Sequence, residues 1–248
     1  MRRHEVTEVT KDVFCAGGTD VNWILLREGT DLTLIDSGWI GDVAVLEASI
    51  RSLGRRPEDV RGVLLTHAHV DHVGGLNHLH DTYGVPVYMN PREVPHARRE
   101  HLEQATAMDV ARRSWRPNVF AWGLRIARAG AFTHVAVEHA RPFPGDGPLD
   151  LPGRPVPVAC HGHTSGHSAY HLPAAGAVAT GDALITGHAI SRLTGPQLLP
   201  AYFTHAPGEA RASLDAVAAL DADIVLPGHG RPWHGAVADA VAAARAAG

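Results

Sequence analysis

One short segment constrains this 248-residue chain more than any other: THAHVDHVGG at residues 66–75. It places three imidazoles and a carboxylate within six residues, directly after the apolar run at 62–65, which is predicted to be a buried strand. Neutral imidazole and carboxylate are ligands for zinc and iron. Four such groups cannot all point at one ion, but they can divide between two. The segment therefore predicts a metal site, whereas the total of 18 histidines proves nothing by itself.

Four further segments follow strand-like runs in the order that a known family requires. They are Asp36-Ser37-Gly38, His161-Gly162-His163-Thr164-Ser165-Gly166-His167, Thr180-Gly181-Asp182 and Pro227-Gly228-His229-Gly230. Together with segment 66–75 they resemble the signature of the metallo-β-lactamase superfamily, and the resemblance extends from about Val6 to about Trp233. It implies an α/β fold, the four-layer αββα sandwich, in a single domain spanning 1–248.

The resemblance also implies a specific role for each site residue. It implies one ion held by His67, His69 and His163, a second held by Asp71, His72 and His229, and Asp182 as the bridge between them. Asp36 would order the ligand loop through hydrogen bonds, although a simple turn residue is an equal alternative. His167 matches a frequent family histidine, expected to be a buried hydrogen-bonding residue. His161 stands where the family often has proline, and Cys160 lies upstream of the ligand position.

Two divalent ions imply hydrolysis. Even one zinc lowers the pKa of bound water to about 7, so a hydroxide shared by two ions can attack a carbonyl carbon. The ion that holds Asp71 would also stabilise the leaving group, which makes Asp71 the expected catalytic residue. We expect zinc, with iron or manganese as alternatives, because such sites accept several metals.

The substrate expected from the sequence is a small ester, thioester or lactone. Asp182, where a thiolate-using β-lactamase would carry cysteine, points away from β-lactam hydrolysis, which stays an alternative. A persulfide dioxygenase with one iron is another alternative from the same superfamily. The stretch at 190–195 does not match the pattern of those oxygenases. A metal-stabilised binding module without turnover is a third alternative.

An insertion at about 91–130 is predicted to be helical, in segments 92–105, 108–115 and 119–129. It carries eight arginines against four acids. We expect either a substrate wall, with Arg113 and Arg116 binding an anionic group and Tyr202 reaching back from a later loop, or a solvated helical face. Single strands are predicted at 6–14 and 132–137.

Composition adds few constraints. The net charge of −4 gives no signal for binding nucleic acid, and no apolar stretch suggests a signal peptide or a membrane span. The two cysteines, Cys15 and Cys160, are compatible with a reducing compartment. The sequence therefore predicts a cytoplasmic protein that acts on a small-molecule substrate, and it leaves the oligomeric state open.

Overall fold

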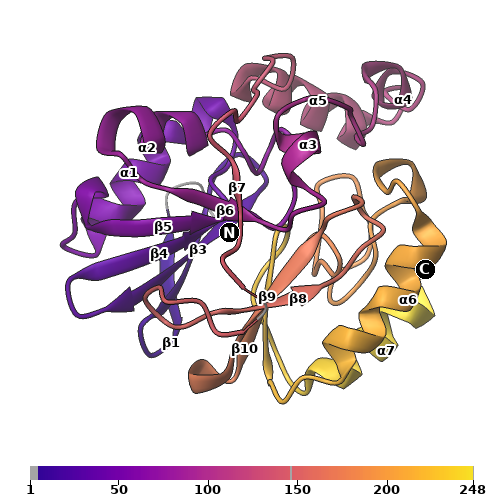
Figure 1. The fold of residues 1–248 in the computed structure, drawn as a ribbon. Helices are drawn as coiled ribbons and strands as arrows, with labels where there is room; N and C mark the ends of the chain where they lie inside the picture. Colours follow the sequence, from indigo (N-terminus) through magenta and orange to yellow (C-terminus); the bar gives the residue numbers. More distant parts are fainter. Residues whose placement is uncertain (1–4, 146, 248) are drawn as a thin grey trace.

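The computed structural model describes residues 5–145 and 147–247, and two β-sheets form its centre (Figure 1). The first sheet has the order β1-β2-β3-β4-β5-β6-β7, antiparallel as far as β4 and parallel from there on. Its strands are β1 (Val6–Thr10), β2 (Val13–Gly17), β3 (Asn22–Glu28), β4 (Asp31–Ile35), β5 (Val60–Leu64), β6 (Val87–Met89) and β7 (Arg141–Pro142).

The second sheet has the order β12-β11-β10-β9-β8, in which only β10 and β11 run parallel among the described strands. Its strands are β8 (Val156–Ala159), β9 (Ser168–Leu172), β10 (Ala177–Gly181), β11 (Ile224–Pro227) and β12 (Trp233–His234).

Helices cover the outer face of each sheet. Helices α1 (Val43–Ser52) and α2 (Leu76–Tyr83) lie outside the first sheet, and α6 (Pro207–Ala218) and α7 (Val237–Ala247) lie outside the second. The insertion, with α3 (Val94–Ala97), α4 (Ala107–Ala111) and α5 (Pro117–Ala129), lies in the upper part of Figure 1, with α4 and α5 at the top. No helix among residues 5–145 and 147–247 is both long and apolar enough to cross a membrane.

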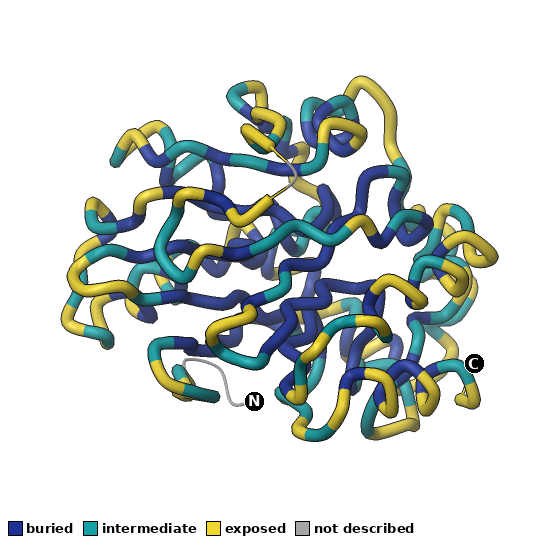
Figure 2. Tube along the Cα trace, turned by 60° about the horizontal axis from the view of Figure 1, so that its bottom comes forward, coloured by how far each residue is buried: buried dark blue, intermediate teal, exposed yellow. Residues whose placement is uncertain are grey.

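The alternation of side chains along the strands produces the layers. Ile24 and Ile35 belong to a buried cluster between the two sheets, whereas Leu25 and Leu34 belong to the cluster under α1 and α2. In the second sheet Val178 packs toward α6 and α7. Because successive residues of a strand point to opposite faces, central strands such as β4 and β10 bury apolar side chains on both faces. Figure 2 shows the buried chain running through the centre of the molecule. The predicted αββα sandwich is confirmed.

Several predicted elements are wrong in extent. The strand expected at 6–14 is two strands, because Asp12 adopts a left-handed φ of 62° and turns the chain back. The helix expected at 92–105 is the single turn α3, and it stops before Arg99, whose φ is also 62°. The helix expected at 108–115 is only α4, and residues 132–137 form no strand.

Helix α5 contains a glycine, Gly123, at a position where the surrounding structure leaves room for a side chain. A Cβ atom at Gly123 would meet nothing within 4 Å, and Gly123 is not among the glycines with positive φ. Glycine in a helix interior costs about 0.5–1 kcal/mol relative to alanine. We therefore expect Gly123→Ala to raise the free energy of unfolding by about that amount in urea titrations. A loss of stability would show that α5 needs the glycine.

Candidate metal centre

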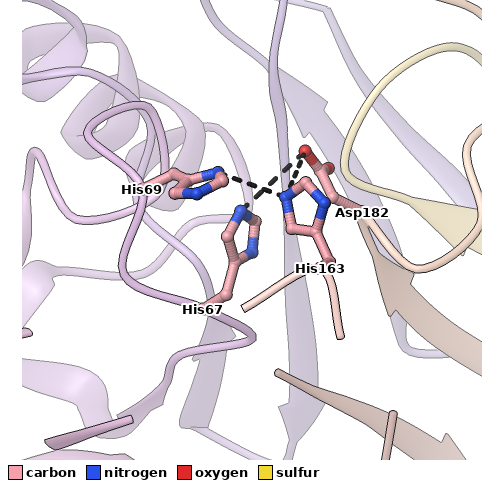
Figure 3. A group of neighbouring side chains, drawn as sticks. All are labelled: His67, His69, His163 and Asp182. Carbon is pink, nitrogen blue, oxygen red and sulfur yellow. Dashed lines mark hydrogen bonds and ion pairs between the residues drawn. The ribbon is translucent and has the colours of Figure 1, made fainter. Parts of the chain in front are cut away.

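The structure brings the seven predicted ligands together at the ends of four strands. His67, His69, Asp71 and His72 follow β5, His163 lies between β8 and β9, Asp182 directly follows β10, and His229 follows β11. They form two groups, and within each group the ligand atoms lie within 4.8 Å of one another. The first group is His67, His69, His163 and Asp182; the second is Asp71, His72 and His229. Figure 3 shows the first group, with its side chains pointing toward a common centre.

Hydrogen bonds to the second ring nitrogen fix which nitrogen of each histidine faces that centre. His72 Nδ1 donates to Asp36 Oδ2 at 2.8 Å, and His229 Nδ1 donates to the carbonyl of Asp20 at 2.6 Å. Carboxylate and carbonyl oxygens can only accept, so each Nδ1 carries the hydrogen when the ring is neutral. The lone pair of Nε2 is then available, which is the usual arrangement of a metal-binding histidine.

The first group is oriented in the same way. His69 Nε2 donates to the carbonyl of Glu103 at 2.7 Å, which leaves its Nδ1 facing His163 Nε2 at 3.1 Å. Thr66 Oγ1 donates to Asp36 and therefore accepts from His67 Nδ1 at 3.0 Å. His67 Nε2 and His69 Nδ1 thus each keep a free lone pair. The 3.1 Å between His69 Nδ1 and His163 Nε2 is close to the separation of about 3.3 Å between two ligands of one tetrahedral zinc, given bonds of roughly 2.0–2.1 Å.

Unpartnered buried atoms show that the site is built for an additional group. His67 Nε2, His72 Nε2 and Asp182 Oδ1 are fully buried, yet none has a hydrogen-bond partner in the protein. Asp182 Oδ1 lies 3.6 Å from His72 Nε2, and Asp182 Oδ2 lies 3.2 Å from His229 Nε2 and 3.6 Å from His163 Nε2. Buried polar atoms are almost always paired. Divalent cations would satisfy these atoms, so the donor set fits a metal pair with Asp182 between the two groups.

Asp36 and His167 occupy supporting positions next to the ligands. Asp36, which is buried, accepts hydrogen bonds from the backbone N–H and hydroxyl of Thr66 and from His72. His167 Nε2 accepts the backbone N–H of Asp182 at 3.1 Å. Asp36 therefore orients the ligand His72, and His167 contacts the backbone of the ligand Asp182.

Gly228 makes the close approach at the bridge possible. A Cβ atom at this position would collide with Asp182 Oδ1 and would lie 3.0 Å from His72 Cε1. Only glycine leaves room for both side chains, which explains why the loop after β11 has glycine directly before His229.

The two groups differ in their protonation without a metal. Burial lowers the pKa of His67 and His163 well below the ordinary value, and neighbouring histidines lower it further. Burial would also lower the pKa of His72, but Asp36, Asp71 and Asp182 outweigh it and raise that pKa to about 9. At His229, burial is likewise outweighed by Asp182 and Asp71, which raise the pKa well above 6.5.

This contrast predicts unequal proton release on metal binding. At pH 7, His72 and His229 are protonated in the metal-free protein and must lose about two protons to become ligands. His67 and His163 are already neutral and release none. Affinity at the group of Asp71, His72 and His229 should therefore rise with pH up to about 9, while the other group changes little. Calorimetric titrations in buffers of different ionisation enthalpy measure this; equal release for both ions would contradict it.

Glu93 is a supporting residue that no motif in the sequence predicts. Its fully buried carboxylate accepts four hydrogen bonds: from Ala68 N–H at 2.7 Å, His96 Nδ1 at 2.9 Å, Thr164 Oγ1 at 2.7 Å and Gly166 N–H at 3.0 Å. Glu93 thereby joins the loop of His67 and His69 to the loop of His163. No spacing in the sequence connects position 93 with these two loops.

A large cavity opens in front of the ligands. Its volume is about 820 Å³, and its lining includes His69, Asp71, His163, Asp182 and His229. Ligand-binding pockets typically measure roughly 300–1,000 Å³. The cavity is therefore of the size of a small-molecule site and gives direct access to the candidate metal centre.

The insertion does form a wall of this cavity, but not with the expected residues. Arg113, Arg116 and Tyr202 are absent from the lining. The Arg113 guanidinium stacks on the Tyr202 ring at 3.9 Å, and that of Arg116 lies 5.1 Å from the centre of the Trp115 ring. Both arginines thus contact aromatic rings outside the lining, and the partner of Arg113 comes from a distant part of the chain that charge counting does not reveal.

His188, which carries no motif, lines the cavity instead. Its Nδ1 accepts the backbone N–H of Ile190 at 3.3 Å, so its Nε2 carries the hydrogen. Burial and the nearby His229 lower the pKa of His188 to about 4, which keeps the ring neutral. His188 therefore presents a hydrogen-bond donor beside the candidate metal centre.

Comparisons with known proteins agree with this geometry. The chain is 27% identical over 224 residues to the probable metallo-hydrolase YflN of Bacillus subtilis, covering 85% of this chain and 80% of that protein. It is 30% identical over 233 residues to the uncharacterized protein Rv2581c of Mycobacterium tuberculosis, covering 88% of this chain and 89% of that protein. A hydroxyacylglutathione hydrolase of Dechloromonas aromatica is 28% identical over 205 residues, but the matched part is only 55% of that enzyme.

Solved structures and a family model identify the fold and the family. The Rm3 metallo-beta-lactamase superposes with a TM-score of 0.69 at 19% identity, covering 96% of this chain and 90% of that one. The metallo-beta-lactamase family protein TTHA1429 of Thermus thermophilus superposes with a TM-score of 0.62 at 24% identity, covering 90% of this chain and 72% of that one. The model of the metallo-beta-lactamase superfamily matches residues 16–229. Sequence, fold and site agree, and the chain belongs to the metallo-beta-lactamase superfamily.

Proposed function

We propose that the protein is a hydrolase that uses two divalent metal ions, preferably zinc, to cleave a small ester, thioester or lactone. One observation carries the proposal: five histidines and two carboxylates form two adjoining groups, and buried atoms of His67, His72 and Asp182 lack any hydrogen-bond partner in the protein. Iron and manganese are the alternative metals, because histidine and carboxylate accept both.

The metal pair, when bound, supplies a Lewis acid for the substrate carbonyl and a hydroxide at neutral pH. The protein supplies the remaining functions. Asp71 lines the cavity, and we assign its carboxylate the transfer of a proton toward the leaving group. His188 donates a hydrogen bond from Nε2 to a substrate oxygen. Asp36 and His167 keep the ligands in orientation.

Elemental analysis combined with a substrate panel tests the proposal. The purified protein should contain about two equivalents of metal, and the loaded protein should hydrolyse activated acetyl esters, thioesters or a simple lactone. Chelation should abolish that activity, and zinc should restore it. One iron per chain together with dioxygen uptake on a persulfide would favour the oxygenase instead. Hydrolysis of a β-lactam alone would favour the lactamase alternative, and no turnover by fully loaded protein would leave a binding module.

A further inference from the structure

The cavity in front of the candidate metal centre is apolar on the side of the insertion. Helix α5 contributes a continuous stripe at helical spacing, and further apolar side chains complete the wall. The apolar members of the lining include Trp39, Val70, Leu102, Val110, Val119, Phe120, Trp122, Leu124, Ile126, Phe132, Leu199 and Phe203. Monomeric proteins rarely leave large apolar side chains clustered in the open without a binding function.

Several of these side chains remain exposed although they are large. Leu102 is 58% exposed, Phe120 is 56% exposed, and Phe132 is 77% exposed. All three belong to the same cavity wall, so water contacts an apolar surface that leads to the metal ligands. Covering such a surface with an apolar group of a ligand is favourable.

The described part of the wall contains few charged side chains for an anionic ligand. Among the described residues of the lining, Arg99 is the only arginine or lysine. Its Nε donates to the carbonyl of Val135 at 2.7 Å, and its Nη1 donates to that of Ala68 at 2.7 Å. Its Nη2 is buried and has no hydrogen-bond partner in the protein. Two of the Arg99 donors therefore hold the wall together, and a carboxylate on the far part of a substrate would give up water to contact a wall that is mostly apolar.

Gly123 adds room to this cavity. It lies on the α5 stripe with Val119, Phe120, Ile126 and Ala127, all of which line the cavity. Its missing side chain serves no local packing, because a Cβ there would have no atom within 4 Å. The glycine therefore leaves space along the apolar wall of the cavity.

From these observations we propose that the cavity binds an uncharged aliphatic chain of medium length on the substrate, so that the substrate class is a fatty-acyl ester, thioester or lactone. The inference rests on the proposed hydrolase function and adds to it the part of the substrate remote from the cleaved bond. It replaces the anionic group expected from the arginines of the insertion with a neutral, apolar one.

A chain-length series tests the proposal with the metal-loaded protein. Para-nitrophenyl acetate, butanoate, hexanoate and octanoate share one leaving group, so differences in kcat/KM report binding of the chain. Each added methylene should raise kcat/KM about two- to fourfold. The mono-para-nitrophenyl ester of succinate, which ends in a carboxylate, should be at least about tenfold poorer than the butanoate ester. A flat series would overturn the inference while leaving the hydrolase function intact, whereas no hydrolysis of any ester would count against the function itself.

Variants at position 123 locate the effect. Gly123→Phe should fill the cavity, lowering kcat/KM for the octanoate at least about tenfold and leaving the acetate nearly unchanged. Ala121→Phe, on the same helix but exposed and outside the lining, is the matched control and should behave like the wild type. Leu102→Ala should lower the octanoate rate severalfold, while Leu193→Ala, equally exposed at 50% but outside the lining, should not. Parallel responses of the two leucine variants would contradict the proposal.

A binding measurement makes the test independent of catalysis. The neutral ketone 2-decanone cannot be hydrolysed, and its chain should enter the cavity beside Trp39 and Trp122, which both line it. We expect a change in tryptophan fluorescence with the metal-free protein, much weaker binding of 2-butanone, and loss of 2-decanone binding in Gly123→Phe. Equal binding by that variant would place the chain elsewhere and refute the assignment.

Discussion

Asp182→Ala is expected to lose metal far more severely than any change outside the ligand set. The Asp182 carboxylate lies within 3.9 Å of ring nitrogens from both groups, so its loss removes the shared anion of the site. Burial alone would raise the pKa of Asp182, but His229 and His72 hold it well below its usual range, which keeps the carboxylate charged. Bound metal, measured by elemental analysis after desalting, should fall by at least about one equivalent, and hydrolysis should become undetectable.

Asp36→Ala provides the contrast. Asp36 is buried as well, but it contacts Thr66 and His72 rather than the converging nitrogens. Its removal should reduce metal affinity about 10–100-fold, as for other groups that orient ligands, and leave the stoichiometry intact at saturating metal. It should also lower the free energy of unfolding by about 1–3 kcal/mol. Equal loss of metal equivalents in both variants would invalidate this division of roles.

Glu93→Ala is expected to destabilise the fold strongly, although Glu93 is no metal ligand in our assignment. Its carboxylate is 0% exposed and accepts four hydrogen bonds, and its loss would leave the N–H groups of Ala68 and Gly166 buried without a partner. Each unsatisfied buried group costs about 1–3 kcal/mol, so the free energy of unfolding should fall by about 3–5 kcal/mol. For a chain of this size the thermal midpoint should fall by about 6–20 °C.

Glu100→Ala is the control for that measurement. Glu100 lies seven residues further along the same insertion and is exposed, so its removal should change the free energy of unfolding by no more than about 0.5 kcal/mol. Guanidinium chloride titrations of the metal-free variants separate the packing effect from metal binding. If Glu93→Ala unfolded like Glu100→Ala, the carboxylate would not be what joins the two ligand loops.

The layered fold and the grouping of the ligands were expected from the resemblance to a known family, whose motifs occur in this chain in the same order. Segment 66–75 follows a buried strand, and Asp182 and His229 each follow an apolar run, so the local pattern adds that these ligands lie at strand ends.

The insertion could not be predicted because tertiary contacts decide its course. The left-handed φ of Arg99 ends α3, and the Arg99 guanidinium then binds carbonyls of Ala68 and Val135, far from it in sequence. The Arg113 guanidinium stacks on the ring of Tyr202, a residue of another loop. Charge and periodicity within 91–130 do not predict these partners. No motif in the sequence predicts that His188 lines the cavity either.

Each group of ligands takes members from both halves of the sandwich. His67 and His69 follow the first sheet while His163 and Asp182 belong to the second, and His72 and His229 are divided in the same way. A bound ion therefore closes a chain loop on the order of 100 residues or more, as a disulfide would. In the chain-entropy model such a cross-link is worth about 4–5 kcal/mol, provided the unfolded chain keeps the link. Unlike a disulfide, an ion can dissociate, so the resistance of this sandwich to unfolding would follow the free metal concentration around it.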